Sequence, residues 1–94
     1  MKILSAEEVK EKLNDIIGWE IVDNKLIKEY KLKDFSDAIS FIVKIGIEAE
    51  KLDHHPDLYL YGWNKVKVIL FTHSANGITE NDINLAHKIE QTVK

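Results

Sequence analysis

The sequence contains no cysteine, a single proline and four isolated glycines. Without cysteine the chain can form no disulfide framework, no thiolate-ligated metal or iron–sulfur site and no thiol nucleophile. Long apolar runs are also missing. The most apolar stretch, residues 38–47, is interrupted by Lys44 and is far shorter than the roughly 20 residues of a membrane span. We therefore expect no signal peptide, no membrane association and a cytoplasmic location.

An excess of basic residues is missing as well. The chain has 13 basic and 16 acidic side chains, which gives a formal net charge of −3 with neutral histidines. Because nucleic-acid binding needs a basic face to neutralise phosphates, we expect no nucleic-acid partner. With 45% hydrophobic and 31% charged residues, the composition is that of an ordinary globular protein. Residues 1–94 are interpreted as a single domain.

Three segments carry helix signals. The first, 5–16, opens with a capping box formed by Ser5 and Glu8. The second begins near Asp34 and ends at or before residue 54, because Pro56 disfavours the helical conformation just before it. The third opens at a variant capping box formed by Thr79 and Asp82.

The second helix is the expected spine of the domain. Its apolar residues recur at helical spacing. We expect Gly46, in the middle of this helix, to allow the close approach of a strand. The predicted buried stripe comprises Phe35, Ala38, Ile39, Ile42, Ile45, Gly46, Ala49 and Leu52, widened by Phe41, Val43 and Ile47.

Two β-hairpins lie between the helices. Residues 19–22 and 25–31 flank the turn-forming pair Asp23-Asn24, and residues 57–61 and 65–71 flank residues 62–64. The predicted order is α-β-β-α-β-β-α. This order indicates an α+β domain with a four-stranded antiparallel sheet and three helices packed on one face.

Three of the four histidines bracket the second hairpin. His54 and His55 precede it, and His73 follows it. Pairing in a hairpin is nearly symmetric about the turn, here centred near Trp63, so the numbers of paired residues sum to about 126. We therefore expect the three histidines to lie side by side. His87, in the last helix, belongs to no such group and is interpreted as a surface residue.

Clustered imidazoles suit acid–base chemistry near neutral pH, because neighbouring groups push one another into different protonation states. Glu50 lies four residues before His54 and can orient it. A three-histidine metal site is an alternative, although consecutive histidines are awkward joint ligands. Three aromatic residues of the second hairpin could stack on a flat ligand but are interpreted as packing residues; they are Tyr59, Tyr61 and Trp63.

These motifs resemble those of the pterin-4a-carbinolamine dehydratases. The resemblance rests on Glu50, His54-His55-Pro56, Asn64-Lys65-Val66, Thr72-His73, Gly77-Ile78-Thr79 and Asp82. The element order and the early Gly18-Trp19 pair extend it over nearly the whole chain. One residue more than usual separates Pro56 from Asn64, and Trp63 replaces a usual tyrosine, which indicates a bulge or a longer turn in the hairpin.

The resemblance implies a dehydratase that needs no metal or other cofactor. Its substrate would be a 4a-hydroxytetrahydropterin and its product a quinonoid dihydropterin, in tetrahydropterin recycling. His54, His55 and His73 would be catalytic: His54 and His73 would exchange protons, and His55 would hold the pterin and assist. Glu50 would orient His54, and Asp82 would support His73. The substrate-binding residues would be Glu50, Pro56, Thr72, Ser74, Ala75 and Asp82.

The resemblance also implies a homodimer or homotetramer that assembles through sheet edges and helices. The expected small-molecule partner is the pterin. Two other functions fit the same residues less well. One is a non-catalytic dimerisation or assembly module on the same fold, and the other is a small hydrolase in which the histidines bind a metal.

Overall fold

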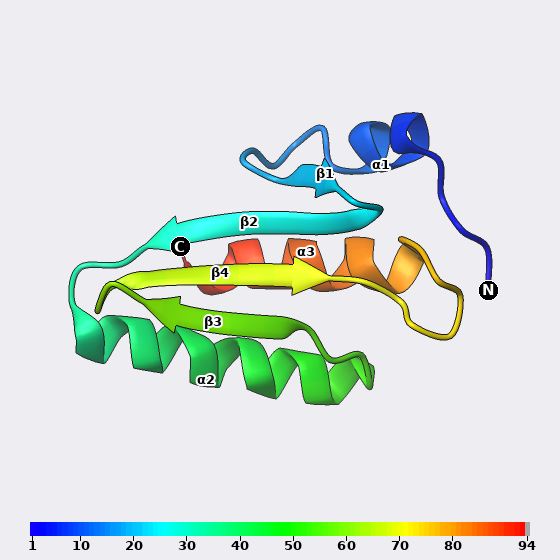
Figure 1. Ribbon diagram of the computed structural model, residues 1–94. Coiled ribbons are helices and arrows are strands. Elements are labelled where there is room, and N and C mark those ends of the chain that lie inside the picture. Colours follow the sequence, from blue (N-terminus) through cyan, green and yellow to red (C-terminus); the bar gives the residue numbers. More distant parts are fainter. Residues whose placement is uncertain (94) are drawn as a thin grey trace.

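The computed structural model describes residues 1–93 and has the predicted order α-β-β-α-β-β-α (Figure 1). The elements are α1 (Ala6–Lys12), β1 (Glu20–Val22), β2 (Lys25–Lys31), α2 (Phe35–Leu52), β3 (Asp57–Tyr61), β4 (Lys65–Leu70) and α3 (Glu80–Thr92). The four strands form one antiparallel sheet in the order β1-β2-β4-β3. The predicted α+β class is confirmed.

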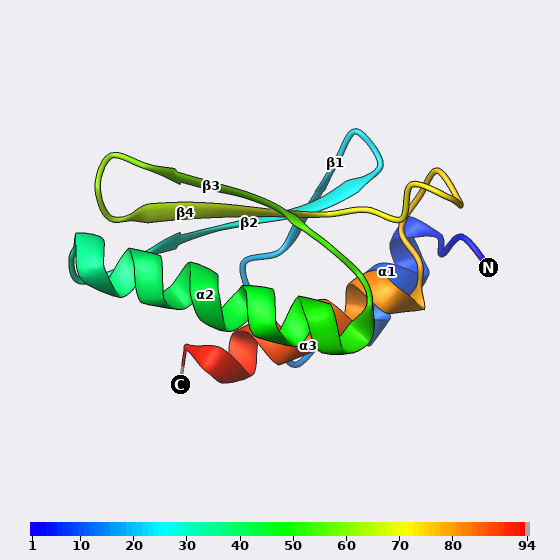
Figure 2. The ribbon, with the colours of Figure 1, turned by 90° about the horizontal axis from the view of Figure 1, so that it is seen from below.

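The helices lie on one side of the sheet, with α2 and α3 side by side beneath it and α1 at one end (Figure 2). The core lies between these layers. Alternate residues of β4 are fully buried, as are Leu26 of β2 and Ile45 of α2. None of the helices in residues 1–93 is long and apolar enough to cross a bilayer.

The register of the second hairpin is the one that the sequence predicts. Pairs run from Asp57↔Ile69 to Tyr61↔Lys65, so the numbers of paired residues sum to 126. At the turn of the first hairpin, Asp23 and Asn24 both have positive φ angles (50° and 66°). This is the backbone that matches the right-handed twist of two paired strands.

Two helix predictions need correction. The first helix ends at Lys12 rather than near residue 16, and the next residues include Asn14 and Asp15, whose side chains compete with helical hydrogen bonds. In α2, Gly46 does not meet a strand, because a Cβ atom built there would have no neighbour within 4 Å.

The apolar stripe of α2 is only partly buried. Ala38, Phe41, Ile45 and Ala49 face the core. Five other apolar residues of this helix are exposed. One is Leu52, at its last position, and the other four recur at every fourth position and form the outer α2 stripe, which comprises Phe35, Ile39, Val43 and Ile47. The helix therefore carries a second apolar face that nothing in residues 1–93 covers.

A largely buried polar cluster joins the sheet to α3. Lys28 of β2 donates to the Glu90 carboxylate at 2.7 Å and to the carbonyl of Ile17, and the Tyr30 hydroxyl also bonds Glu90. Burial, and then the hydrogen bond to Glu90, raises the pKa of the Tyr30 hydroxyl. The hydroxyl therefore stays protonated and donates, as a buried carboxylate requires.

The capping box of α1 makes a pH-dependent contribution to stability. Hydrogen bonds from Lys2 and then from the Ser5 amide lower the pKa of Glu8 from 4.5 to about 2. A lowered native pKa means that the stabilisation is complete above the unfolded-state pKa and is lost as the pH falls toward 2. Urea titrations at a series of pH values measure this contribution. As the pH falls from 5 to 2, we expect the free energy of unfolding to decrease less in Glu8→Gln than in the unchanged protein.

Glu11→Gln is the matched control, because Glu11 is exposed on the same helix and lies outside the capping box. It should lose stability over this range as the unchanged protein does. Identical pH dependence of Glu8→Gln and the unchanged protein would contradict the role of Glu8.

Candidate active site

The C-terminus of α2 delivers two adjacent histidines to the surface. The helix ends at Asp53, which adopts the left-handed conformation (φ 51°, ψ 43°) and donates its N–H to the carbonyls of Ala49 and Glu50. The His54 N–H also bonds the Ala49 carbonyl, at 3.0 Å. This closure of the last turn leads the chain away from the helix axis into β3.

The third histidine lies in the loop that follows β4. This loop, residues 72–77, is closed by hydrogen bonds between Thr72 and Gly77. A Cβ at Gly77 would lie 2.9 Å from Cγ2 of Ile3, so a larger residue there would have to displace the Ile3 side chain. Thr72 is thereby held inside while His73 and Ser74 face solvent.

The hairpin register brings these two segments together, as predicted. His54, His55 and His73 line one open cavity of about 310 Å³. Its other lining residues are Met1, Asp53, Phe71, Thr72, Ser74 and Asn81. The ring of Phe71 lies edge-on to the His73 imidazole, with centroids 5.0 Å apart, and so packs against it at the cavity.

His54 is paired with Asp82. Its Nε2 lies 2.5 Å from Oδ1 of Asp82, and the two side chains are 11% and 0% exposed. We predict from the sequence that Glu50 orients His54 and that Asp82 supports His73; the geometry is different. Asp53 ends the regular helix before residue 54, so His54 turns inward toward α3 instead of continuing the helical face that carries Glu50.

Glu50 contacts His55 instead. The His55 Nε2 lies 2.8 Å from the Glu50 Oε1, and both side chains are largely exposed, at 63% and 79%. An ion pair as exposed as this one contributes little to stability. The three imidazoles therefore differ: His54 has a buried carboxylate partner, His55 has an exposed one, and His73 packs against an aromatic ring.

The expected substrate-binding residues separate into two groups. Thr72 and Ser74 line the cavity, whereas Glu50, Pro56, Ala75 and Asp82 are not among its lining residues. Glu50 and Asp82 touch the site through His55 and His54.

Four residues that line the cavity were not predicted to belong to the site. Phe71 could have been found, because it precedes His73 by two residues on the predicted strand. Asp53 and Asn81 adjoin predicted site residues. Met1 had no sequence signal; it comes near because the Leu4 N–H bonds the Ile78 carbonyl at 2.8 Å.

The aromatic residues of the second hairpin are neither core residues nor cavity residues. Tyr59, Tyr61 and Trp63 are all more than 40% exposed and lie outside the cavity lining. Trp63 occupies the turn with a positive φ angle of 59°, which places it at the end of the hairpin away from the histidines.

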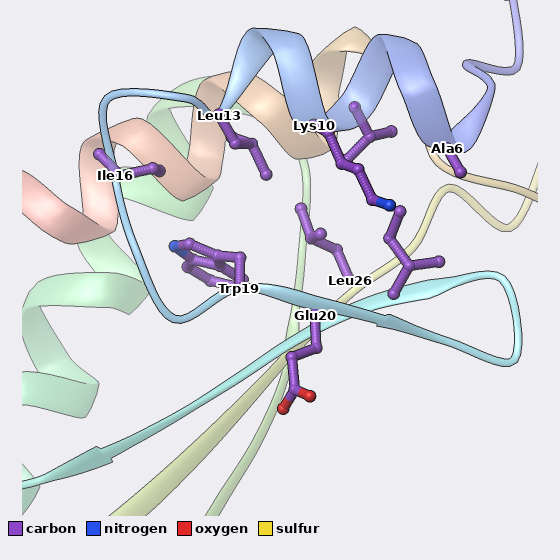
Figure 3. A pocket seen from close by; sticks show the side chains of 9 residues that line it. Ala6, Lys10, Leu13, Ile16, Trp19, Glu20 and Leu26 are labelled. Carbon is purple, nitrogen blue, oxygen red and sulfur yellow. The ribbon is translucent and has the colours of Figure 1, made fainter.

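A larger cavity, of about 620 Å³, lies elsewhere, between α1, the following loop and the first two strands (Figure 3). Leu13, Ile16, Trp19 and Leu26 give it an apolar lining. Among residues 1–93, the titratable side chains that line it are those of Lys10 and Glu20, and the Glu20 carboxylate points away from it (Figure 3). The smaller cavity therefore holds the groups that can exchange protons.

The two paired histidines each direct Nε2 at a carboxylate rather than at a common point. Within residues 1–93, no group of three or more His, Cys, Asp or Glu side chains is arranged to hold a metal ion. The arrangement is suited to proton transfer by imidazoles, one of which is backed by a buried carboxylate.

The chain is similar to known proteins over nearly its whole length. The family model described as "Pterin 4 alpha carbinolamine dehydratase" matches residues 2–92. A Sulfolobus acidocaldarius protein named for pterin-4-alpha-carbinolamine dehydratase is 44% identical over 88 residues, which cover 94% of this chain and 96% of that protein. A Brucella ovis protein named for the same activity is 43% identical over 88 residues, covering 92% and 90%.

Solved structures are similar as well. The crystal structure of a transcriptional coactivator/pterin dehydratase from Brucella melitensis has a TM-score of 0.88 at 41% identity and covers 96% of this chain and 97% of that one. A pterin dehydratase-like protein identified as a RuBisCO assembly factor in the alpha-carboxysome has a TM-score of 0.63 at 15% identity, over 78% and 83%, and shares the fold alone. On the full-length family match and the close relatives, the chain belongs to the pterin-4-alpha-carbinolamine dehydratase family.

Proposed function

We propose that the protein is a cytoplasmic dehydratase that eliminates water from a 4a-hydroxytetrahydropterin and so recycles tetrahydropterins. The observation that carries this proposal is the convergence of His54, His55 and His73 on one cavity. A cavity of about 310 Å³ lies at the small end of the range for ligand sites, about 300–1,000 Å³. That size suits a compact bicyclic ring.

The proposed reaction consists of two proton transfers. The C4a–O bond of the substrate breaks, and the hydroxyl leaves as water with a proton from a general acid. A general base takes the proton from N5, and the N–H bonding electrons form the C4a=N5 bond of the quinonoid dihydropterin. Nothing is oxidised or reduced, so the step requires no redox cofactor, and two imidazoles can supply both proton transfers.

The different surroundings of the imidazoles support a division of labour. Asp82 stabilises the imidazolium that forms when His54 accepts a proton, which suits His54 as the base. His73, on an exposed loop, can exchange protons with solvent and suits the acid. His55, which lines the cavity and pairs with the exposed Glu50 carboxylate, would hold the pterin, with Thr72, Ser74, Pro56 and Ala75 near the ring.

Replacement of the two proton-transfer groups tests this assignment. We expect His54→Ala and His73→Ala each to lower the rate constant of dehydration by about 10²–10⁴-fold, because each removes one general acid–base group. Stopped-flow absorbance with freshly generated 4a-hydroxytetrahydropterin measures this rate. His87→Gln is the matched control, because His87 lies on α3 outside the cavity, where its Nε2 is 3.0 Å from the Lys12 carbonyl oxygen and 3.9 Å from the Asp15 carboxylate. Unchanged rates in both alanine variants would refute the catalytic assignment.

Metal removal separates the proposed reaction from metal-dependent hydrolysis. After dialysis against EDTA, we expect the dehydration rate to stay within the error of the untreated sample, because both steps are proton transfers. Elemental analysis of the purified protein should find less than stoichiometric zinc and iron. Loss of activity on dialysis, with recovery on addition of zinc, is the opposite outcome.

We also propose that the protein is a homodimer or homotetramer and that the outer α2 stripe contributes to an interface. The four apolar side chains of the stripe are 44–55% exposed. Gly46 adjoins them with open space above it, and Ser36 and Ser40 lie on the same face. Small residues among apolar ones let a second helix approach closely. The exposed edge strand β3 offers a further surface for strand pairing.

A charge placed within the stripe should weaken assembly. We expect Val43→Glu to shift the protein to a smaller species in sedimentation-velocity experiments, because association would bury the new carboxylate in an apolar contact. Lys44→Glu is the control, since Lys44 is exposed on the same helix but outside the stripe, and it should leave the oligomeric state unchanged. Equal sedimentation of Val43→Glu and the unchanged protein would place the interface elsewhere.

A further inference from the structure

A small buried cluster of polar groups lies behind His54. Thr72 at the end of the second hairpin is 5% exposed, and Thr79 and Asp82 at the start of α3 are both 0% exposed. Polar atoms buried this deeply must find hydrogen-bond partners within the protein. The partners of these three residues form one connected chain that ends at the imidazole of His54.

The directions of these hydrogen bonds follow from counting hydrogens. Asp82 Oδ2 accepts from the Thr79 backbone N–H at 2.9 Å and lies 2.9 Å from Thr72 Oγ1. Because a carboxylate oxygen only accepts hydrogen bonds, Thr72 must donate its one hydroxyl hydrogen to Asp82. The 2.7 Å contact between the two threonine hydroxyls is then donated by Thr79, whose oxygen accepts from the Asn81 N–H.

The same count fixes the tautomer of His54. Oδ1 of Asp82 is also an acceptor, so the hydrogen in its 2.5 Å contact with His54 comes from Nε2. When the imidazole is neutral, Nδ1 therefore has no hydrogen and is the basic nitrogen. Thr79 thus donates to Thr72, and Thr72, the Thr79 amide and His54 all donate to the Asp82 carboxylate, which links the N-cap of α3 to the histidine.

We propose that Thr72 is a positioning residue of the site: its hydroxyl, together with the Thr79 amide, orients the Asp82 carboxylate so that His54 keeps its proton on Nε2 and offers Nδ1 as the base. Thr72 thus acts through Asp82 and His54, and its hydroxyl has no hydrogen left to donate to a pterin. The orientation of Asp82 and the tautomer of His54 do not depend on the proposed function. Only the effect of Thr72 on the reaction rate rests on that function.

An amide in place of the carboxylate gives the sharpest consequence. In Asp82→Asn, the two donors from Thr72 and Thr79 hold the amide oxygen at the place of Oδ2. The NH₂ group must then face Nε2 of His54, which can meet it only as an acceptor. The neutral imidazole is expected to change to the Nδ1–H tautomer, so that the nitrogen previously available as a base carries a hydrogen.

Long-range ¹⁵N–¹H correlation spectra distinguish protonated from unprotonated ring nitrogens and test this on the full chain. At a pH where His54 is neutral, we expect Nε2–H in the unchanged protein and Nδ1–H in Asp82→Asn. Nδ1–H in the unchanged protein, or Nε2–H in a folded Asp82→Asn, overturns the proposal. The tautomer of the unchanged protein can be measured without any variant. It therefore tests the proposal even if Asp82→Asn does not fold.

The kinetic arm compares Thr72→Val, which keeps the side-chain shape without the hydroxyl, with Thr72→Ser, which keeps the hydroxyl. We expect Thr72→Val to lower kcat about tenfold with KM little changed, because a buried carboxylate loses one of its donors, and Thr72→Ser to restore most of kcat. Equal kcat in folded Thr72→Val and the unchanged protein, or an equal loss in both variants, contradicts the proposal.

Failure of this inference and failure of the proposed function give different results. An unchanged protein that has no dehydratase activity, but shows the two expected tautomers, would refute the function and leave the hydrogen-bond chain standing. An active enzyme whose His54 carries its proton on Nδ1 would do the reverse.

Discussion

The Asp82 carboxylate is the group on which the local structure depends. It is completely buried and receives hydrogens from three elements: the N-cap of α3, the end of the second hairpin and the segment that follows α2. An ionised carboxylate taken out of water is costly unless such donors surround it. Its position at the N-terminus of α3 helps as well, since the helix dipole favours negative charge there. All three elements must therefore be in place together before this residue is stable.

This requirement joins the capping of α3 to the geometry of the site. The same oxygen that completes the capping box accepts the Thr72 hydroxyl, and the other oxygen holds His54. A conventional helix start thereby also supports His54, the residue proposed as the base. The support is rigid, because a capped helix and a paired hairpin fix both ends of the hydrogen-bond chain. Groups held by such elements keep their geometry better than groups on free loops.

Local patterns predicted much of this arrangement. The capping boxes at Ser5–Glu8 and Thr79–Asp82 are present, and the hairpin pairs with the predicted register. These features depend on spacing along the chain. Gathering of the three histidines follows from the register alone, because the two ends of a hairpin meet whatever lies around them.

Features that depend on three-dimensional detail were not predictable. Helical spacing made Glu50 the expected partner of His54, but the left-handed backbone of Asp53 ends that spacing one residue earlier. Likewise the apolar pattern of α2 shows that the helix has two apolar faces and does not say which one the sheet covers. Ile39 and Val43 were expected in the core but lie on the uncovered face. The expected contact of Gly46 with a strand is wrong as well.

The fold by itself does not determine the activity, because a structure with the same architecture is identified as a RuBisCO assembly factor. A catalytic use of this fold differs from a structural use in whether the buried pair of Asp82 and His54 is needed. An assembly module would use the Asp82 carboxylate as a helix cap but would gain little from the largely buried imidazole that faces it, since a buried carboxylate–histidine pair is at best weakly stabilising. In an enzyme the same pair has a use, because the carboxylate fixes the tautomer and stabilises the charge that appears when the imidazole takes a proton. The unequal burial of the two carboxylate–histidine pairs, with 0% exposure at Asp82 and 79% at Glu50, thus favours proton transfer at His54 and ligand contact at His55.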